Sequence, residues 1–189
     1  MRKHIILITG VPGIGKTTAI IKMAETLKAQ GYKIGGIITK EKREGNARVG
    51  FTIQDLLTEK QGWLAHVKQP NGPRIGKYRI NLADLEEVGA SAIQDAIGTA
   101  DIIIIDEIGP MELHSRAFKE AVMHATDSTK PAIATVHYNA ADAFVREIKA
   151  RQDAEVYEVT LENRDVMHKF ITDRIIKILL EQQKGQQKC

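Results

Sequence analysis

The sequence predicts an α/β fold in which a mainly parallel central sheet is flanked by helices and carries a small antiparallel extension. Two observations support this prediction. Apolar runs of strand length alternate with segments of helical period along most of the chain. The run "DIIIID" at 101–106 is too apolar for an edge strand and is typical of a parallel strand covered on both faces. The 189 residues fit one domain, which we place at 1–180, followed by a polar, flexible tail at 181–189.

The N-terminal elements begin with a buried strand, "HIILIT", and a helix whose apolar residues recur from Ile20 to Leu27 before a stop at Gly31. The next strand, "YKIGGIITKE", is followed by a polar loop, "KREGNARVG", and by "VGFTIQDL", which forms a hairpin with that strand. Two further short strands, "GWLAHV" and "KYRI", are separated by the turn-rich stretch "KQPNGPRIG". The region from about 32 to 81 therefore contains the antiparallel extension.

In the second half of the chain, strands and helices alternate more regularly. Asn81 is a plausible N-cap of a helix that runs through Ile97, and Ser115 can cap the helix that follows the isoleucine strand. After the buried strand "PAIATV", Asn139 is predicted to cap a helix through Ile148. The strand "EVYEVT" and a long helix after Asn163 complete the alternation. In such folds ligands bind at the carboxyl ends of the parallel strands.

The stretch "GVPGIGKTT" follows the first strand and has the G-x-x-x-x-G-K-T spacing of a phosphate-binding P-loop. Glycines let the backbone N–H groups approach an anion, and the helix that starts at the loop adds its free N–H groups and positive dipole. Lys16 supplies a cation for the β- and γ-phosphates, and the Thr17 hydroxyl is a predicted Mg²⁺ ligand. The predicted nucleotide contacts from this loop are Gly10, Val11, Pro12, Gly13, Ile14, Gly15, Lys16, Thr17 and Thr18.

Two adjacent acids end the isoleucine strand at the same edge of the sheet as the P-loop. Asp106 is positioned to hold Mg²⁺ in its outer shell, complementing Thr17, because Mg²⁺ uses few protein ligands and keeps several waters. Glu107 can accept a proton from the water that attacks the γ-phosphate, and Lys16 and Glu107 are the predicted catalytic residues. Gly109 offers a backbone N–H to the γ-phosphate. Glu112, in the turn beyond Pro110, is a weaker catalytic candidate.

Composition limits the class of protein. Lys and Arg total 27 against 24 Asp and Glu, and this near balance gives no reason to expect an obligatory nucleic-acid partner. The apolar runs are shorter than the roughly 20 residues that span a bilayer, and the N-terminus shows no cleavable leader. The sole cysteine, Cys189, forms no disulfide within the chain. We therefore expect a cytoplasmic protein without membrane attachment, acting as a monomer.

Beyond the P-loop, several segments resemble the THEP1-type nucleoside-triphosphatases over about residues 4–180. These segments, in order, are "DEIGPMELHS", "IATVH", "EIKARQD" and "VTLENRD". The resemblance implies a RecA-like P-loop fold and Mg²⁺-dependent hydrolysis of ATP, GTP, CTP and UTP to the diphosphate. Family members often have lysine where this chain has Pro110. This chain therefore lacks a possible cation near the acids.

The resemblance also extends the set of candidate residues. Arg43 and Arg48, in the polar loop, match the paired-arginine segment of the family and are therefore candidates for contacting the triphosphate or nucleotide; a solvated cation is the alternative for each. Asn163 and Arg164 are candidates for the base side, or else simply begin the last helix. His137 ends a predicted strand at the P-loop edge, where it is either a γ-phosphate sensor or, the interpretation we favour, an ordinary strand-end histidine.

Three functions fit these residues. The first is hydrolysis of nucleoside triphosphates, favoured because the pair Asp106 and Glu107 suits water as the acceptor. The second is a nucleotide or small-molecule kinase whose acceptor pocket is built by residues 40–80; such kinases usually close an arginine-rich lid, and no dense arginine cluster is present. The third is a nucleotide-dependent switch acting on a partner protein. The guanine-reading element N-K-x-D is absent from the sequence, so we expect weak base selectivity.

Overall fold

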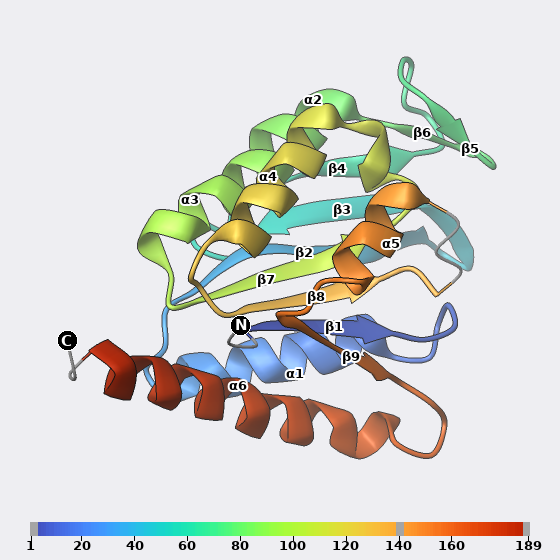
Figure 1. Ribbon diagram of the computed structural model, residues 1–189. Coiled ribbons are helices and arrows are strands. Elements are labelled where there is room, and N and C mark those ends of the chain that lie inside the picture. The colour runs from blue at the N-terminus through green and yellow to red at the C-terminus, as the bar shows by residue number, and fades with distance from the viewer. Residues whose placement is uncertain (1–3, 139–141, 187–189) are drawn as a thin grey trace.

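The protein is described by a computed structural model of residues 4–138 and 142–186 (Figure 1). The strands are β1 Ile5–Thr9, β2 Ile34–Glu44, β3 Ala47–Asp55, β4 Gln61–His66, β5 Arg74–Ile75, β6 Tyr78–Ile80, β7 Ile102–Ile108, β8 Ala132–Val136 and β9 Ala154–Glu158. The helices are α1 Lys16–Ala29, α2 Leu82–Asp84, α3 Ser91–Thr99, α4 Arg116–Asp127, α5 Ala143–Lys149 and α6 Arg164–Gln186. A π-helical segment, Leu85–Ala90, joins α2 to α3, and a 3₁₀ turn, Glu112–His114, precedes α4.

All the strands form one mixed sheet with the order β5-β6-β4-β3-β2-β7-β8-β1-β9 in the described part of the chain. Strands β2, β7, β8, β1 and β9 pair in parallel, whereas β3, β4, β5 and β6 continue the sheet in antiparallel pairs. The predicted α/β fold, with a mainly parallel centre and an antiparallel extension, is therefore confirmed. Strand β8 separates β1, which leads into the P-loop, from β7, which carries the acids.

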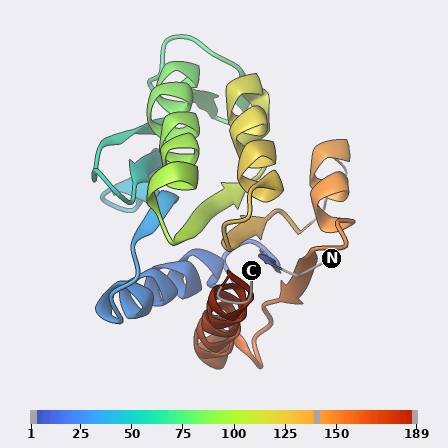
Figure 2. The ribbon, with the colours of Figure 1, turned by 60° about the vertical axis from the view of Figure 1, so that its left-hand side comes forward.

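Helices cover both faces of the sheet (Figures 1 and 2). Helices α1 and α6 pack on one face, where Ile102 and Ile104 of β7 join a core that includes Ile20 and Ile171. Helices α3, α4 and α5 lie on the other face, where Ile103 and Ile105 contribute to a second core around Phe118. The unbroken isoleucine run thus results from alternating side chains that are buried on both faces. No helix in the described residues is long and apolar enough to cross a membrane.

The hairpin formed by β2 and β3 is longer than predicted. The stretch expected to be a polar loop is paired, with Arg43 opposite Arg48 and a turn only at residues 45 and 46. Glu41 bridges both arginines, at 2.5 Å from Arg43 Nε and 3.0 Å from Arg48 Nη1. The ion pair between Glu41 and Arg48 crosses the two strands and supports a ladder in this strongly polar sequence. The predicted turn at 68–76 likewise contains the short strand β5, which pairs with β6.

The helix ends were partly predictable. Asn81 accepts a hydrogen bond from Asp84 N, and Ser115 accepts one from Phe118 N, which confirms both predicted caps. Asn139 lies outside the described residues, and helix α5 is capped by Asp142, whose side chain accepts from Phe144 N. Helix α6 runs to Gln186, into the stretch predicted to be a flexible tail.

Candidate nucleotide site

The segment between β1 and α1 has the geometry of an anion-binding loop. Gly13 and Gly15 have φ angles of +77° and +112°, and the places where their Cβ atoms would lie are open. At Gly10 there is no room for a side chain, because a Cβ there would lie 2.7 Å from the Val159 carbonyl oxygen. Helix α1 has no side-chain cap and no acid in its first turn. Its N-terminal N–H groups and dipole are therefore available to a phosphate.

Lys16 lies across this loop. Its Nζ donates to the Gly10 carbonyl oxygen at 2.9 Å, and the side chain is buried. The ammonium group is thus held beside the loop by backbone carbonyls, where it can contact the β- and γ-phosphates of a bound nucleotide.

Asp106 is fully buried at the carboxyl end of β7. Its Oδ1 accepts a hydrogen bond of 2.5 Å from the Thr135 hydroxyl, whereas Oδ2 is buried and makes no hydrogen bond of normal geometry within the described residues. Burial raises the pKa of Asp106 to about 6, although hydrogen bonding from Thr135 and Thr17 acts in the opposite direction. Asp106 Oδ2 and the Thr17 hydroxyl together offer the small number of protein oxygens that Mg²⁺ prefers.

Glu107 and Glu112 differ from Asp106 because both line an open cavity. Glu107 is half-buried, whereas Glu112 is buried in the turn that follows β7. Burial raises the pKa of Glu112 to about 8, and the negative charges of Glu107 and Asp106 add to this shift. The pairing of β7 with β8 shifts in register between Ile105 and Ile108, where Asp106 and Glu107 lie.

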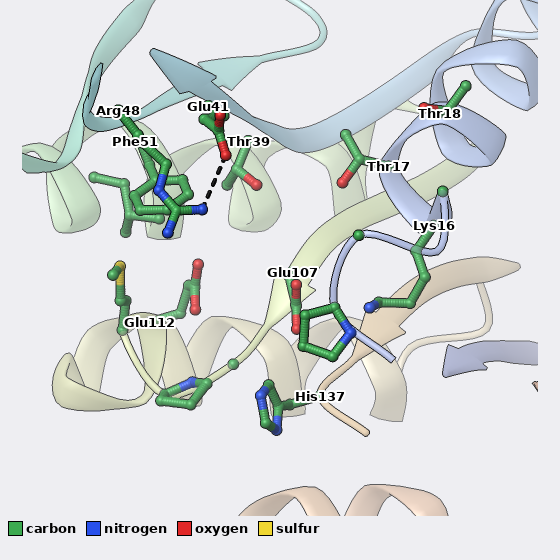
Figure 3. A pocket seen from close by; sticks show the side chains of 17 residues that line it. Lys16, Thr17, Thr18, Thr39, Glu41, Arg48, Phe51, Glu107, Glu112 and His137 are labelled. Atoms are coloured by element: carbon green, nitrogen blue, oxygen red, sulfur yellow. Dashed lines mark hydrogen bonds and ion pairs between the residues drawn. The ribbon is translucent and has the colours of Figure 1, made fainter. Parts of the chain in front are cut away.

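The cavity has a volume of about 540 Å³ and connects the P-loop with the antiparallel extension. Figure 3 shows Lys16, Thr17 and Thr18 at one side, Glu107 in the middle, and Arg48, Phe51 and Glu112 at the other side. The lining residues are Pro12, Gly13, Gly15, Lys16, Thr17, Thr18, Thr39, Glu41, Arg48, Phe51, Leu64, Glu107, Gly109, Pro110, Met111, Glu112 and His137.

Comparison with known proteins gives the family. A family model described as NTPase matches residues 5–172. The chain belongs to the NTPase family.

Relatives agree with this assignment. The nucleoside-triphosphatase THEP1 of Thermofilum pendens is 50% identical over 162 residues, which is 85% of this chain and 89% of that protein. The protein of the same name from Methanosarcina acetivorans is 45% identical over 175 residues, covering 92% and 98% of the two chains.

Solved structures of relatives also match this NTPase. The crystal structure of THEP1 from Aquifex aeolicus has a TM-score of 0.77 at 31% identity, covering 88% of this chain and 96% of that one. The solution structure of a human cancer-related nucleoside triphosphatase has a TM-score of 0.78 at 32% identity, covering 93% and 97%.

The predicted site residues of this NTPase occupy different places. From the P-loop, Gly10, Val11 and Ile14 do not belong to the cavity lining, although they form part of the loop. Arg48 lines the cavity, whereas Arg43 points to Glu41 and the Asn46 carbonyl.

Asn163 and Arg164, at the start of α6, are also outside the cavity lining. The Asn163 side chain accepts from Thr160 N and donates to the Glu158 carbonyl, so it fixes the turn between β9 and α6.

Sequence reasoning missed several lining residues, namely Thr39, Glu41, Phe51, Leu64 and Met111. A usable signal existed for Thr39, because β2 is parallel to β7 and its buried run ends there, at the ligand-binding edge of the sheet. Phe51 and Leu64 lie on antiparallel strands, where the strand-end rule gives no guidance.

Proposed function

We propose that this NTPase hydrolyses ATP, GTP, CTP and UTP to the diphosphate and phosphate, with Mg²⁺ and with weak selectivity for the base. The observation that carries the proposal is one cavity in which Lys16 and Thr17 of the P-loop lie at one side and Glu107 lies next to them, in the middle. The names of the relatives, nucleoside-triphosphatase THEP1, support the same reaction class.

Each residue has a separable task in this reaction. The backbone of the P-loop and the N-terminus of α1 bind the phosphates, and Lys16 stabilises the charge that develops on them. Thr17 and Asp106 would hold Mg²⁺, which neutralises charge on the β- and γ-phosphate oxygens when it is bound. Glu107 orients the attacking water and accepts its proton.

Base selectivity should be weak because the P-loop contacts are made to phosphates, which all nucleoside triphosphates share. The test is release of inorganic phosphate from ATP, GTP, CTP and UTP, each with Mg²⁺ and with chelator. We expect kcat/KM values for ATP and GTP within about tenfold of one another, a difference of about 1.4 kcal/mol. We also expect activity to require Mg²⁺. A preference of about a hundredfold for one base, or undiminished activity in chelator, would contradict this proposal.

A further inference from the structure

The cavity continues beyond the place of the reacting phosphate. Lys16 and Thr17 mark the triphosphate end, and Glu107 lies between that end and the antiparallel extension (Figure 3). If Glu107 takes the proton of the attacking group, as the proposed function requires, the attack on the γ-phosphate comes from its side of the cavity. The part beyond Glu107 is therefore on the acceptor side; we call this part, lined by Arg48, Phe51, Leu64, Met111 and Glu112, the acceptor compartment.

One wall of the acceptor compartment is apolar and contains a fixed aromatic ring. The Phe51 ring packs edge-on against Tyr78, with centroids 5.3 Å apart. The Arg48 guanidinium lies 5.4 Å from the Phe51 ring centroid and is itself held by the Tyr78 hydroxyl at 2.8 Å. Leu64 and Met111 extend the apolar lining. An attacking water needs no apolar wall, whereas a planar ring gains from contact with Phe51, Leu64 and Met111.

The opposite wall presents a carboxyl group that can both donate and accept. Glu112 is only 5% exposed, and it has no ion pair with Lys, Arg or His among the described residues. Because burial raises its pKa to about 8, Glu112 keeps its proton at neutral pH. A protonated carboxyl pairs well with the polar edge of an uncharged heteroaromatic ring, which has both donors and acceptors.

We propose that the acceptor compartment binds a hydroxyl-bearing heteroaromatic molecule of the nucleoside class, and that the protein transfers the γ-phosphoryl group to this hydroxyl in competition with water. The ring lies against Phe51, its polar edge faces Glu112, and the hydroxyl points toward Glu107. The acceptor oxygen forms a bond to the γ-phosphorus while the bond from that phosphorus to the β,γ-bridging oxygen breaks. The acceptor proton passes to Glu107, and the products are a phosphate monoester and the nucleoside diphosphate.

The experiment uses γ-labelled ATP with Mg²⁺ and adenosine, guanosine, cytidine, uridine or thymidine at about 1 mM, the upper range of usual KM values. Labelled monoester and labelled inorganic phosphate are separated and counted. We expect a labelled monoester with at least one nucleoside. Inorganic phosphate alone with every nucleoside would overturn the acceptor proposal and leave the proposed triphosphatase intact. If monoester forms but no inorganic phosphate is released when acceptor is left out, the acceptor proposal stands and the proposed triphosphatase activity is overturned. If neither product forms, both proposals are overturned.

Variants of Phe51 locate the transfer in the acceptor compartment. Phe51→Ala should lower the ratio of monoester to inorganic phosphate by about tenfold, the lower range for losing one base–aromatic stack. Phe51→Tyr, which keeps the ring, should preserve the ratio and controls for misfolding. Phe170→Ala removes an exposed ring on α6, outside the cavity lining, and should leave the ratio unchanged. An unchanged ratio in Phe51→Ala would overturn the assignment of the acceptor to this compartment, as would equal losses in Phe51→Ala and Phe51→Tyr.

Discussion

Glu107 and Glu112 line the same cavity, but their surroundings suit them to different chemistry. Glu107 is half-buried and close to the P-loop side, whereas Glu112 is buried in the turn beyond Gly109. Glu107→Gln keeps the size of the side chain but removes the proposed base. Single-turnover phosphate release should therefore fall by about 10²-fold or more, within the range of general-base catalysis, while binding of nucleotide persists in a titration with a fluorescent analogue.

The matched control for this variant is Glu162→Gln, an exposed glutamate outside the cavity, which should hydrolyse at the wild-type rate. Asp106→Asn should instead weaken Mg²⁺-dependent binding, because it alters the carboxylate beside Thr17. If Glu107→Gln kept the wild-type rate, the base would lie elsewhere, and Glu112 would be examined first through a rise of the rate with pH up to about 8.

Glu112 also makes stability depend on pH. Its pKa is raised from 4.5 to about 8 in the folded protein, so between these values the folded state holds a proton that the unfolded state has released. The associated stability is present below about pH 4.5 and is lost as the pH rises through about 8. Glu112→Gln has no proton to lose, and its free energy of unfolding relative to wild type should rise over this range by at least about 1.4 kcal/mol, the value of one pKa unit.

Urea unfolding of wild type and Glu112→Gln on the two sides of this pH range measures the effect. Glu162→Gln, again the exposed control, should differ from wild type by the same amount at both pH values. A constant difference for Glu112→Gln would show that the Glu112 carboxyl titrates alike in the folded and unfolded states.

At the scale of elements, the contact between β2 and β7 depends on a glycine. Gly36 has a φ angle of +98°, and a Cβ there would lie 2.1 Å from the Ile104 carbonyl oxygen. Gly36→Ala should therefore cost roughly 3 kcal/mol or more, from strain and overpacking together. Gly45→Ala is the matched control, since Gly45 has a φ of +56° but open space around it, and it should cost about 1 kcal/mol. Equal losses in chemical denaturation would contradict a steric role for Gly36.

The elements differ in how well the sequence predicts them. The isoleucines of β7 and the glycines before α1 produce their structure through local rules of periodicity and backbone conformation. The stretch from Arg43 to Arg48 breaks such rules, because its strand pairing includes an ion pair between Glu41 and Arg48 that forms only once the hairpin has closed. Helix α6 likewise continues beyond the last clear apolar repeat, to Gln186.

The residues of the candidate site also differ in how well the sequence predicts them. Lys16, Thr17, Asp106 and Glu107 were predictable because a P-loop motif and strand ends place them at one edge of a parallel sheet. On the side of the cavity away from the P-loop, Arg48 and Glu112 were candidates, but Phe51 and Leu64 were missed. The contact that holds Arg48 there, with Tyr78, joins residues 30 positions apart in the chain. Contacts of this kind depend on strand register, which hydrophobic pattern alone does not determine in a polar hairpin.

At the scale of the whole molecule, one mixed sheet joins two parts with different roles. Its parallel strands end at the P-loop and the acids, as in other α/β proteins that bind ligands at this edge. Its antiparallel strands β3 and β4 extend the same sheet and supply Arg48, Phe51 and Leu64 to the side of the cavity away from the P-loop. The antiparallel pairing of β2 with β3 joins the two parts, so both sides of the cavity belong to one continuous sheet.

The contacts of the cavity arginine predict a slow enzyme. Rapid phosphoryl transfer in related sites relies on an arginine finger, which is worth roughly 10³ to 10⁵ in rate. Within the described part of the chain, Arg48 is the arginine that lines the cavity, and Glu41 and Tyr78 engage its guanidinium on the wall away from the P-loop. We therefore expect a kcat on the order of 10⁻² s⁻¹ at saturating Mg²⁺ and ATP.

Steady-state phosphate release at several protein concentrations tests this expectation and separates the possible sources of a finger. A kcat above about 10 s⁻¹ that is independent of protein concentration would mean that an arginine of the same chain reaches the phosphates. In that case Arg48→Ala should abolish the excess rate, whereas Arg43→Ala, which removes an arginine outside the cavity lining, should not. A kcat that rises with protein concentration would instead mean that a second copy supplies the arginine, which would also contradict the predicted monomer. Because Glu41 and Tyr78 already hold the Arg48 guanidinium, we expect a slow rate at every protein concentration.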